Sequence, residues 1–252
     1  MSSSSEPAAA KTVDAALTLL EEVATQRGAT LSDLARATGM TTSKAFRLLG
    51  TLERRGYLER RSGKAFELGS KVLHLGHRAA RGHPLVRAAA PVLDRLAERF
   101  GETVLLAVRV DLERVIVDSR DAKYGPQLSW PYDARLPLNS GALGLCLLAY
   151  APEHVLRDLL AAGTTAFTDH TVVGAGDIGR ALEAIRREHV YVAKHSYLEG
   201  VYSVGSPVLG PDRNAIASLS VVGTVARLGP AEEDETRTEV RDAAAEIARV
   251  LA

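Results

Sequence analysis

Cysteine is almost absent from this chain of 252 residues, which contains only Cys146. A single cysteine excludes an internal disulfide and any zinc site built from several cysteines. Cys146 lies in the apolar stretch 144–148, so we expect it in the core. His74 and His77 stand at helical spacing, but two histidines without a third ligand nearby are more often surface residues. We therefore expect no metal and no cofactor.

Long hydrophobic runs are also missing. No uninterrupted apolar run approaches the roughly 20 residues that a membrane-spanning helix needs. Residues 1–10 are rich in serine and alanine and lack the apolar centre of a signal peptide. We therefore expect a disordered tail over residues 1–10, no membrane contact and a cytoplasmic protein.

Net charge is zero, since 31 Lys and Arg balance 31 Asp and Glu, but its distribution is uneven. Residues 36–81 hold eleven basic and three acidic residues, whereas residues 84–252 hold 18 basic and 23 acidic ones. A basic end on a mildly acidic body is typical of a protein in which one domain binds nucleic acid. The alternative is an ordinary solvated surface.

Residues 30–68 have the order of a winged helix-turn-helix. Thr30 and Asp33 have the spacing of a capping box at the start of a short helix. Gly39 supplies the turn, where a left-handed residue costs little. The elements predicted to follow are a helix over about 42–55 and two strands over about 57–61 and 64–68.

The second of these helices has a face suited to the DNA major groove, because small polar and basic side chains stand at its exposed start. Its apolar positions are Ala45, Leu48, Leu49 and Leu52. Lys44 or Arg47 would read guanine, and the basic residues of the helix end and wing would contact phosphates. A protein-docking module is the alternative. The predicted DNA-binding residues are Thr42, Ser43, Lys44, Arg47, Thr51, Arg54, Arg55, Arg61 and Lys64.

Three further segments complete the predicted domain plan. A first helix over about 12–25 would place one apolar face on the winged-domain core: Val13, Ala16, Leu17, Leu20 and Ala24. Beyond residue 84, helical and strand patterns alternate, which predicts an α+β domain with helices on a mostly antiparallel sheet. Its expected strands include 103–110, 114–118, 127–130, 190–197, 203–209 and 215–222. The predicted divisions are a winged domain over 11–69, a linker helix over 70–83 and a ligand-binding domain over 84–252.

Six segments in this order resemble the IclR family of bacterial transcription regulators. They are 31–39 (LSDLARATG), 43–49 (SKAFRLL), 51–57 (TLERRGY), 101–104 (GETV), 135–144 (RLPLNSGALG) and 217–221 (ASLSV). The resemblance runs from about Lys11 to the C-terminus. It implies a GAF-like effector-binding domain, a homodimer or tetramer, and promoter control by a small metabolite that often carries a carboxylate.

The expected effector pocket follows from the resemblance and from residue types. Residues 138–143 enter a helix, whose free backbone N–H groups would hold a carboxylate. The chain departs from the family's pattern at 193–196, where acids are usual, and at Ser203, where cysteine is common. Lys194 or His195 would therefore attract an anion. The predicted pocket residues are Leu138, Asn139, Ser140, Gly141, Ala142, Leu143, Lys194, His195, Ser203, Ser220, Tyr124 and Trp130. For each of them the alternative is an ordinary strand or loop position.

Enzyme functions are the rival class. Gly174 to Gly179 fits G-x-G-x-x-G before a helix, and Glu199 lies twenty residues beyond, as in dinucleotide-binding enzymes. The segment that precedes this motif, residues 171–173, is too short for a buried strand. The sequence around Ser203 has one residue too many for G-x-S-x-G. We therefore expect no catalytic residues and a ligand-responsive regulator of transcription that binds double-stranded DNA.

Overall fold

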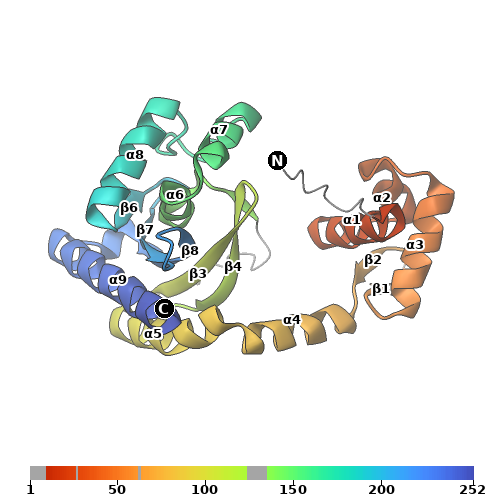
Figure 1. Cartoon of the computed structure of the whole chain (residues 1–252), viewed down its shortest axis with the longest axis horizontal. Helices are drawn as coiled ribbons and strands as arrows, with labels where there is room; N and C mark the ends of the chain where they lie inside the picture. The colour runs from red at the N-terminus through yellow and green to blue at the C-terminus, as the bar shows by residue number, and fades with distance from the viewer. Residues whose placement is uncertain (1–9, 27, 62–63, 124–134) are drawn as a thin grey trace, which may run out of the picture. The chain divides into compact units, whose positions relative to one another are not determined.

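The computed structural model describes residues 10–26, 28–61, 64–123 and 135–252 (Figure 1). The chain divides into two compact units, residues 1–81 and 82–252. No helix among the described residues is long and apolar enough to cross a membrane. The elements of the first unit are α1 (Lys11–Thr25), α2 (Leu31–Ala37), α3 (Thr42–Arg54), β1 (Leu58–Arg60), β2 (Phe66–Leu68) and α4 (Ser70–Gly82).

The first unit is a winged helix-turn-helix, as predicted. Its core contains Leu19 of α1, Leu34 of α2, Leu49 of α3 and Phe66 of β2, all buried. Strands β1 and β2 pair antiparallel and are shorter than predicted. The turn between them falls on residues 62–63, outside the described residues.

The local signals at the start of this unit are confirmed. The Thr30 hydroxyl accepts a hydrogen bond from the Asp33 backbone N–H at 3.4 Å, and the Asp33 carboxylate accepts one from the Thr30 N–H at 3.1 Å. This capping box satisfies two N–H groups that the helix itself leaves free. Gly39 has φ 63°, a conformation that glycine adopts without steric cost.

The prediction for α1 was wrong about most of its buried face, although Leu20 does pack against the core. Val13 and Leu17 are 59% and 50% exposed, whereas Ala15, Leu19 and Val23 are buried. The helix carries two apolar stripes, and helical periodicity alone does not say which one meets the core. The packing of α2 and α3 against α1 decides it.

The second unit is a six-stranded antiparallel sheet, in the order β5-β4-β3-β8-β7-β6, with helices on both faces (Figure 1). Helices α5 and α9 cover one face, and α6 and α8 contribute to the core on the other. The bounds are α5 (Pro84–Phe100), β3 (Thr103–Val110), β4 (Glu113–Arg120), β5 (Leu136–Pro137), α6 (Gly141–Ala149), α7 (Glu153–Ala162), α8 (Ala175–Glu188), β6 (Tyr191–Lys194), β7 (Val201–Leu209), β8 (Ala215–Thr224), the 3₁₀ turn η1 (Val225–Arg227) and α9 (Pro230–Leu251).

The predicted α+β class is confirmed, with two differences in detail. The strand expected over 127–130 lies outside the described residues, and β5 was not predicted. Strand β6 ends at Lys194, three residues earlier than expected. Cys146 lies on α6 and is buried in the core, as predicted.

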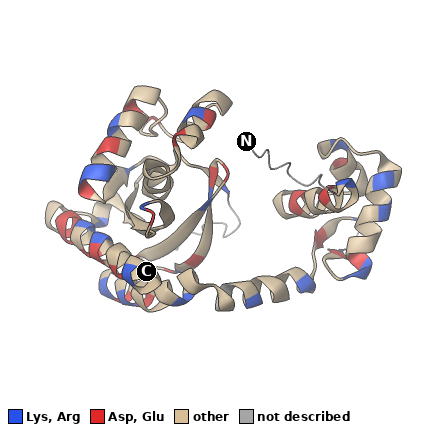
Figure 2. Cartoon of the chain, in the orientation of Figure 1, with Lys and Arg blue, Asp and Glu red and all other residues tan. Residues whose placement is uncertain are grey.

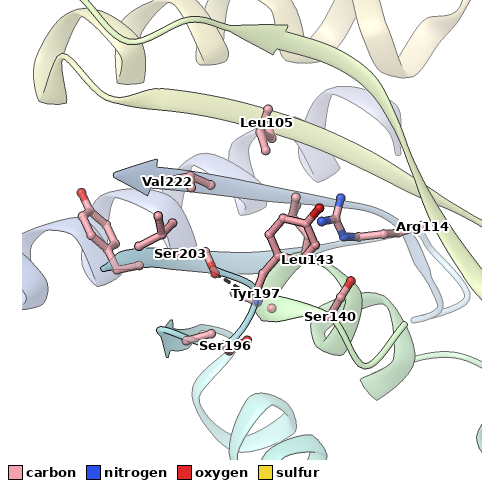
Figure 3. A pocket seen from close by; sticks show the side chains of 13 residues that line it. Leu105, Arg114, Ser140, Leu143, Ser196, Tyr197, Ser203 and Val222 are labelled. Atoms are coloured by element: carbon pink, nitrogen blue, oxygen red, sulfur yellow. Dashed lines mark hydrogen bonds between the residues drawn. The ribbon is translucent and has the colours of Figure 1, made fainter. Parts of the chain in front are cut away.

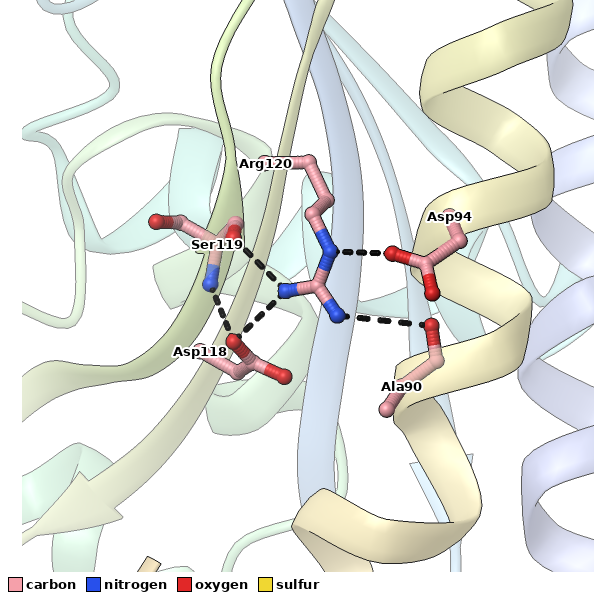
Figure 4. Close-up of polar contacts among 5 residues, drawn as sticks. All are labelled: Ala90, Asp94, Asp118, Ser119 and Arg120. Atoms are coloured by element: carbon pink, nitrogen blue, oxygen red, sulfur yellow. Dashed lines mark hydrogen bonds and ion pairs between the residues drawn. The ribbon is translucent and has the colours of Figure 1, made fainter. Parts of the chain in front are cut away.

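Strand β4 is attached to α5 through Arg120 (Figure 4). Its guanidinium pairs with the carboxylates of Asp94 on α5 and Asp118 on β4, and it donates to the Ala90 carbonyl at 3.5 Å. A register shift in the β3–β4 ladder leaves Val117 without a partner residue on β3. Because such a bulge reverses the side-chain alternation, the end of β4 faces α5 although its start faces α6.

Candidate functional site

A pocket with about 360 Å³ of empty space lies on the sheet face that carries α6. It is bounded by β3, β4, β6, β7 and β8, by the first turn of α6 and by the segment after β6 (Figure 3). Its lining residues are Leu105, Arg114, Ser140, Gly141, Ala142, Leu143, Ala193, Ser196, Tyr197, Val201, Tyr202, Ser203 and Val222.

Small residues allow α6 to lie close to the sheet and to the turn before it. Gly141 begins the helix with φ 65°. A Cβ atom on Gly144 would lie 2.5 Å from the Leu138 carbonyl oxygen, and one on Gly205 would lie 2.9 Å from the Ala142 Cβ. The glycines of this segment therefore set the position of the pocket's helical wall.

Arg114 is a buried cation in the pocket wall, and the sequence analysis did not identify it. The residue is only 3% exposed, and its Nε and Nη1 atoms have no hydrogen-bond partner. Burial lowers the pKa of Arg114 to about 10. The electrostatic interaction with Tyr197 raises this pKa and so offsets part of the effect of burial. The guanidinium is therefore still protonated at neutral pH. Figure 3 shows Arg114 and Tyr197 on the same side of the pocket.

A buried charge with two nitrogens that lack hydrogen-bond partners is costly, and an anion in the pocket would relieve that cost. One sequence signal was available for it. Arg114 and Ile116 are two residues apart on β4 and therefore lie on one face, so a charged residue occupies a position where the strand pattern expects an inward apolar one.

The start of α6 forms the second polar feature of the pocket. Ser140, Gly141, Ala142 and Leu143 line it, and all four belong to the predicted effector set. The Ala142 N–H, expected to be free, already donates to the Ser203 hydroxyl at 3.2 Å. Ser203 thus joins β7 to the helix start.

Three of the predicted pocket residues do not line the pocket. The Ser220 hydroxyl donates to the Val204 carbonyl at 2.9 Å, so it joins neighbouring strands, and Val222 occupies the pocket face two residues on. Leu138 is buried in the core. The amide of Asn139 donates to two carbonyls of the loop before α8, those of Thr165 and Val172.

Lys194 and His195 do not reach the pocket either, which corrects the expectation that one of them attracts the effector. The Lys194 ammonium lies 2.6 Å from the Glu233 carboxylate on α9. His195 follows the end of β6 with φ 60°, and its Nδ1 lies 3.0 Å from a Glu199 carboxylate oxygen. Strand β6 ends at Lys194, so the alternation of side chains along the strand does not determine the direction of His195. The proposed aromatic wall, Tyr124 and Trp130, lies outside the described residues.

The nine predicted DNA-binding residues are all exposed. Thr41 is the N-cap of α3, and its hydroxyl accepts from the Lys44 N–H at 3.3 Å. Figure 2 shows Lys and Arg along α3. The ion pairs in the described part of this unit use Arg36, Arg60 and Arg61, the last with Glu67 at 2.8 Å. Lys44, Arg47 and Arg55 take no part in them.

The nucleotide-binding alternative lacks its structural context. Gly174 is the N-cap of α8, but residues 171–173 form no strand, so the strand–turn–helix arrangement is absent from this described segment. No group of three or more His, Cys, Asp or Glu among the described residues would hold a metal ion.

Two family models match successive parts of the chain. A family model described as "Bacterial transcriptional regulator IclR C-terminal" matches residues 77–249, and one described as "IclR helix-turn-helix domain" matches residues 12–62. The "Glycerol operon regulatory protein" of Streptomyces coelicolor is 31% identical over 227 residues, 88% of either chain.

Two crystal structures show the same fold. An IclR transcriptional regulator from Alicyclobacillus acidocaldarius has a TM-score of 0.88 at 22% identity, covering 97% of this chain and 100% of its own. An IclR homolog from Microbacterium hydrocarbonoxydans, complexed with 4-hydroxybenzoate, has a TM-score of 0.79 at 25% identity, covering 95% of this chain and 98% of its own.

Proposed function

This chain belongs to the IclR family of bacterial transcriptional regulators, and on that premise we propose that a small organic acid, bound beside Arg114, controls its action at a promoter. The protein is a DNA-binding regulator with a C-terminal effector-binding domain, as predicted. What we propose beyond this is the chemical class of the effector and the residues that hold it.

The buried guanidinium of Arg114 carries the proposal. Its Nε and Nη1 atoms have no partner in the protein, and a guanidinium can donate two parallel hydrogen bonds to one carboxylate. The first N–H groups of a helix also favour an anion, and α6 begins in the pocket wall. An anion would therefore meet positive charge from two directions.

The rest of the pocket suits a hydrocarbon body. Leu105, Val201 and Val222 provide apolar surface for it. The Microbacterium relative is complexed with 4-hydroxybenzoate, a small aromatic carboxylate. We propose an effector of the same chemical class, without a catalytic step.

A thermal-shift screen of the full chain tests the proposal. Small carboxylic acids are compared one by one with their uncharged amides, which have the same shape. We expect some acids to raise the unfolding temperature, since ligand at 100 times its Kd stabilises by about 2.7 kcal/mol, while their amides do not. The acids should be recovered unchanged. Equal shifts by acids and amides, or conversion of the acid, would contradict the proposal.

The affinity of such an acid should not change between pH 6 and pH 8. Arg114 stays protonated there, since its pKa of about 10 lies above this range. Carboxylic acids are already ionised, since their pKa values are near 4. Calorimetric titrations at pH 6, 7 and 8 in buffers of equal ionic strength provide the measurement. An affinity that falls through about pH 6.5 would instead show that a histidine contributes.

For the DNA-binding unit we propose that Arg47 reads a base and that Arg55, at the end of α3, contacts a phosphate. Replacing Arg47 with alanine should cost about 1–3 kcal/mol at the operator and relax specificity at one position. Replacing Arg55 with alanine should weaken all sequences similarly and reduce the salt dependence. Fluorescence-anisotropy titrations with operator and scrambled duplexes distinguish the two. Equal losses on both duplexes for Arg47→Ala would contradict its role as a base-reading residue.

We also propose that the protein acts in the cytoplasm as a homodimer or tetramer, because two winged domains would read two half-sites at a fixed spacing. Light scattering of the full chain with and without operator measures the assembly. A monomer bound to a single half-site would contradict this proposal.

A further inference from the structure

Phe46 is a large apolar side chain on the part of α3 that faces away from the core. It is 57% exposed, whereas its neighbour Ala45 is fully buried, as is Leu49 one turn later. A phenylalanine that is more than half exposed forgoes part of the stabilisation that complete burial would provide. Phe46 therefore does not contribute to the core of the unit to which it belongs.

Its position places it among the residues expected to meet base edges. Helix α3 starts after the N-cap Thr41, so Phe46 lies in its second turn. On a helix, residues three and four apart are neighbours, which groups Phe46 with Thr42 and Ser43 on one face. In helix-turn-helix proteins the N-terminal residues of the second helix contact bases in the major groove.

We propose that Phe46 recognises a thymine in the operator by packing against its 5-methyl group. Among the features that base pairs present in the major groove, this methyl is the apolar one, and the others are hydrogen-bond donors and acceptors. A phenyl ring satisfies none of those, so it is favoured beside thymine and disfavoured beside exposed polar edges. Phe46 thereby adds an apolar determinant beside the hydrogen bonds proposed for Arg47.

The inference rests on DNA binding by this unit and not on the proposed base contact of Arg47. Since Phe46 and Arg47 are consecutive, we expect the thymine within about two base pairs of the position at which Arg47→Ala relaxes specificity.

Replacement of thymine by deoxyuridine is the direct test, because it removes the methyl group and keeps every hydrogen bond. An operator is first selected from random duplexes with the full chain, and each thymine is then replaced singly. We expect one thymine per half-site at which uridine weakens binding about fourfold, the contribution of one buried methyl-sized group. At this position Phe46→Ala should bind thymine and uridine equally.

Two variants complete the experiment. Leu17→Ala removes an apolar side chain of α1 that is 50% exposed, and it should keep the wild-type ratio of thymine to uridine affinity. Phe46→Leu retains a smaller apolar side chain, so its ratio should fall between the wild-type value and one, which tests the idea even if Phe46→Ala binds too weakly to measure. Wild-type protein that is indifferent to uridine at every thymine, or Phe46 variants with an unchanged ratio, would overturn the proposal.

Discussion

Replacing Arg114 with methionine is expected to abolish most of the affinity for carboxylate effectors. Loss of one member of a buried, hydrogen-bonded charge pair costs about 2–5 kcal/mol of binding free energy. Without ligand, the variant should be at least as stable as the wild type, since methionine removes a buried charge that has two nitrogens without partners. Isothermal titration and thermal unfolding of the full chain measure the two effects separately.

Arg109→Met is the matched control for this prediction. Arg109 lies opposite Arg114 in the β3–β4 ladder but does not line the pocket, and its guanidinium donates to the Asp111 carbonyl at 2.9 Å. The variant should bind the effector as the wild type does. Arg114→Lys should recover only part of the affinity, because an ammonium lacks the planar pair of donors. Full binding by Arg114→Met would show that the anion is held elsewhere.

Replacing Gly144 with alanine is expected to destabilise the second unit by about 3 kcal/mol, at the upper end of the usual cost of overpacking. The new Cβ would lie 2.5 Å from the carbonyl oxygen of Leu138 and 2.9 Å from the carbonyl carbon of the same residue. Both are backbone atoms, which cannot turn aside as a flexible side chain would. Helix α6 would have to move away from the turn before it, and the pocket wall would move with it. Differential scanning calorimetry of the full chain measures the loss.

Gly179→Ala provides a control of opposite sign in the same unit. Gly179 lies inside α8, and a Cβ there would meet no atom within 4 Å. Alanine should stabilise the helix by about 0.5–1 kcal/mol, because glycine loses more backbone entropy on folding. If both variants lowered stability equally, the close approach of α6 to Leu138 would not explain the destabilisation by Gly144→Ala.

Local features of the fold followed from the sequence because each depends on neighbouring residues. The capping box at Thr30 needs only Asp33 at the right spacing. Gly39 at φ 63° and the turn at Asp111, with φ 53°, are explained by the conformations that these residue types tolerate. The order of such local signals was sufficient to predict the winged unit and the α+β unit.

Features that depend on distant partners were not predicted correctly. The buried face of α1 depends on how α2 and α3 pack against it, because both of its stripes are apolar. Lys194 is directed to Glu233, a residue of α9 nearly forty positions later, and Ser220 bonds to the neighbouring strand. In each case the side chain has a partner that sequence spacing does not reveal.

The two-part architecture and the helix that begins near Gly141 could be predicted because periodicity, caps and turns are encoded over a few residues, and six matching segments carried the family resemblance. The chemistry inside the pocket depended on folding. Arg114 on β4 meets the start of α6 because the strands between them lie side by side in one sheet. A buried charge is functional or structural according to its neighbours, and those neighbours are brought together by folding.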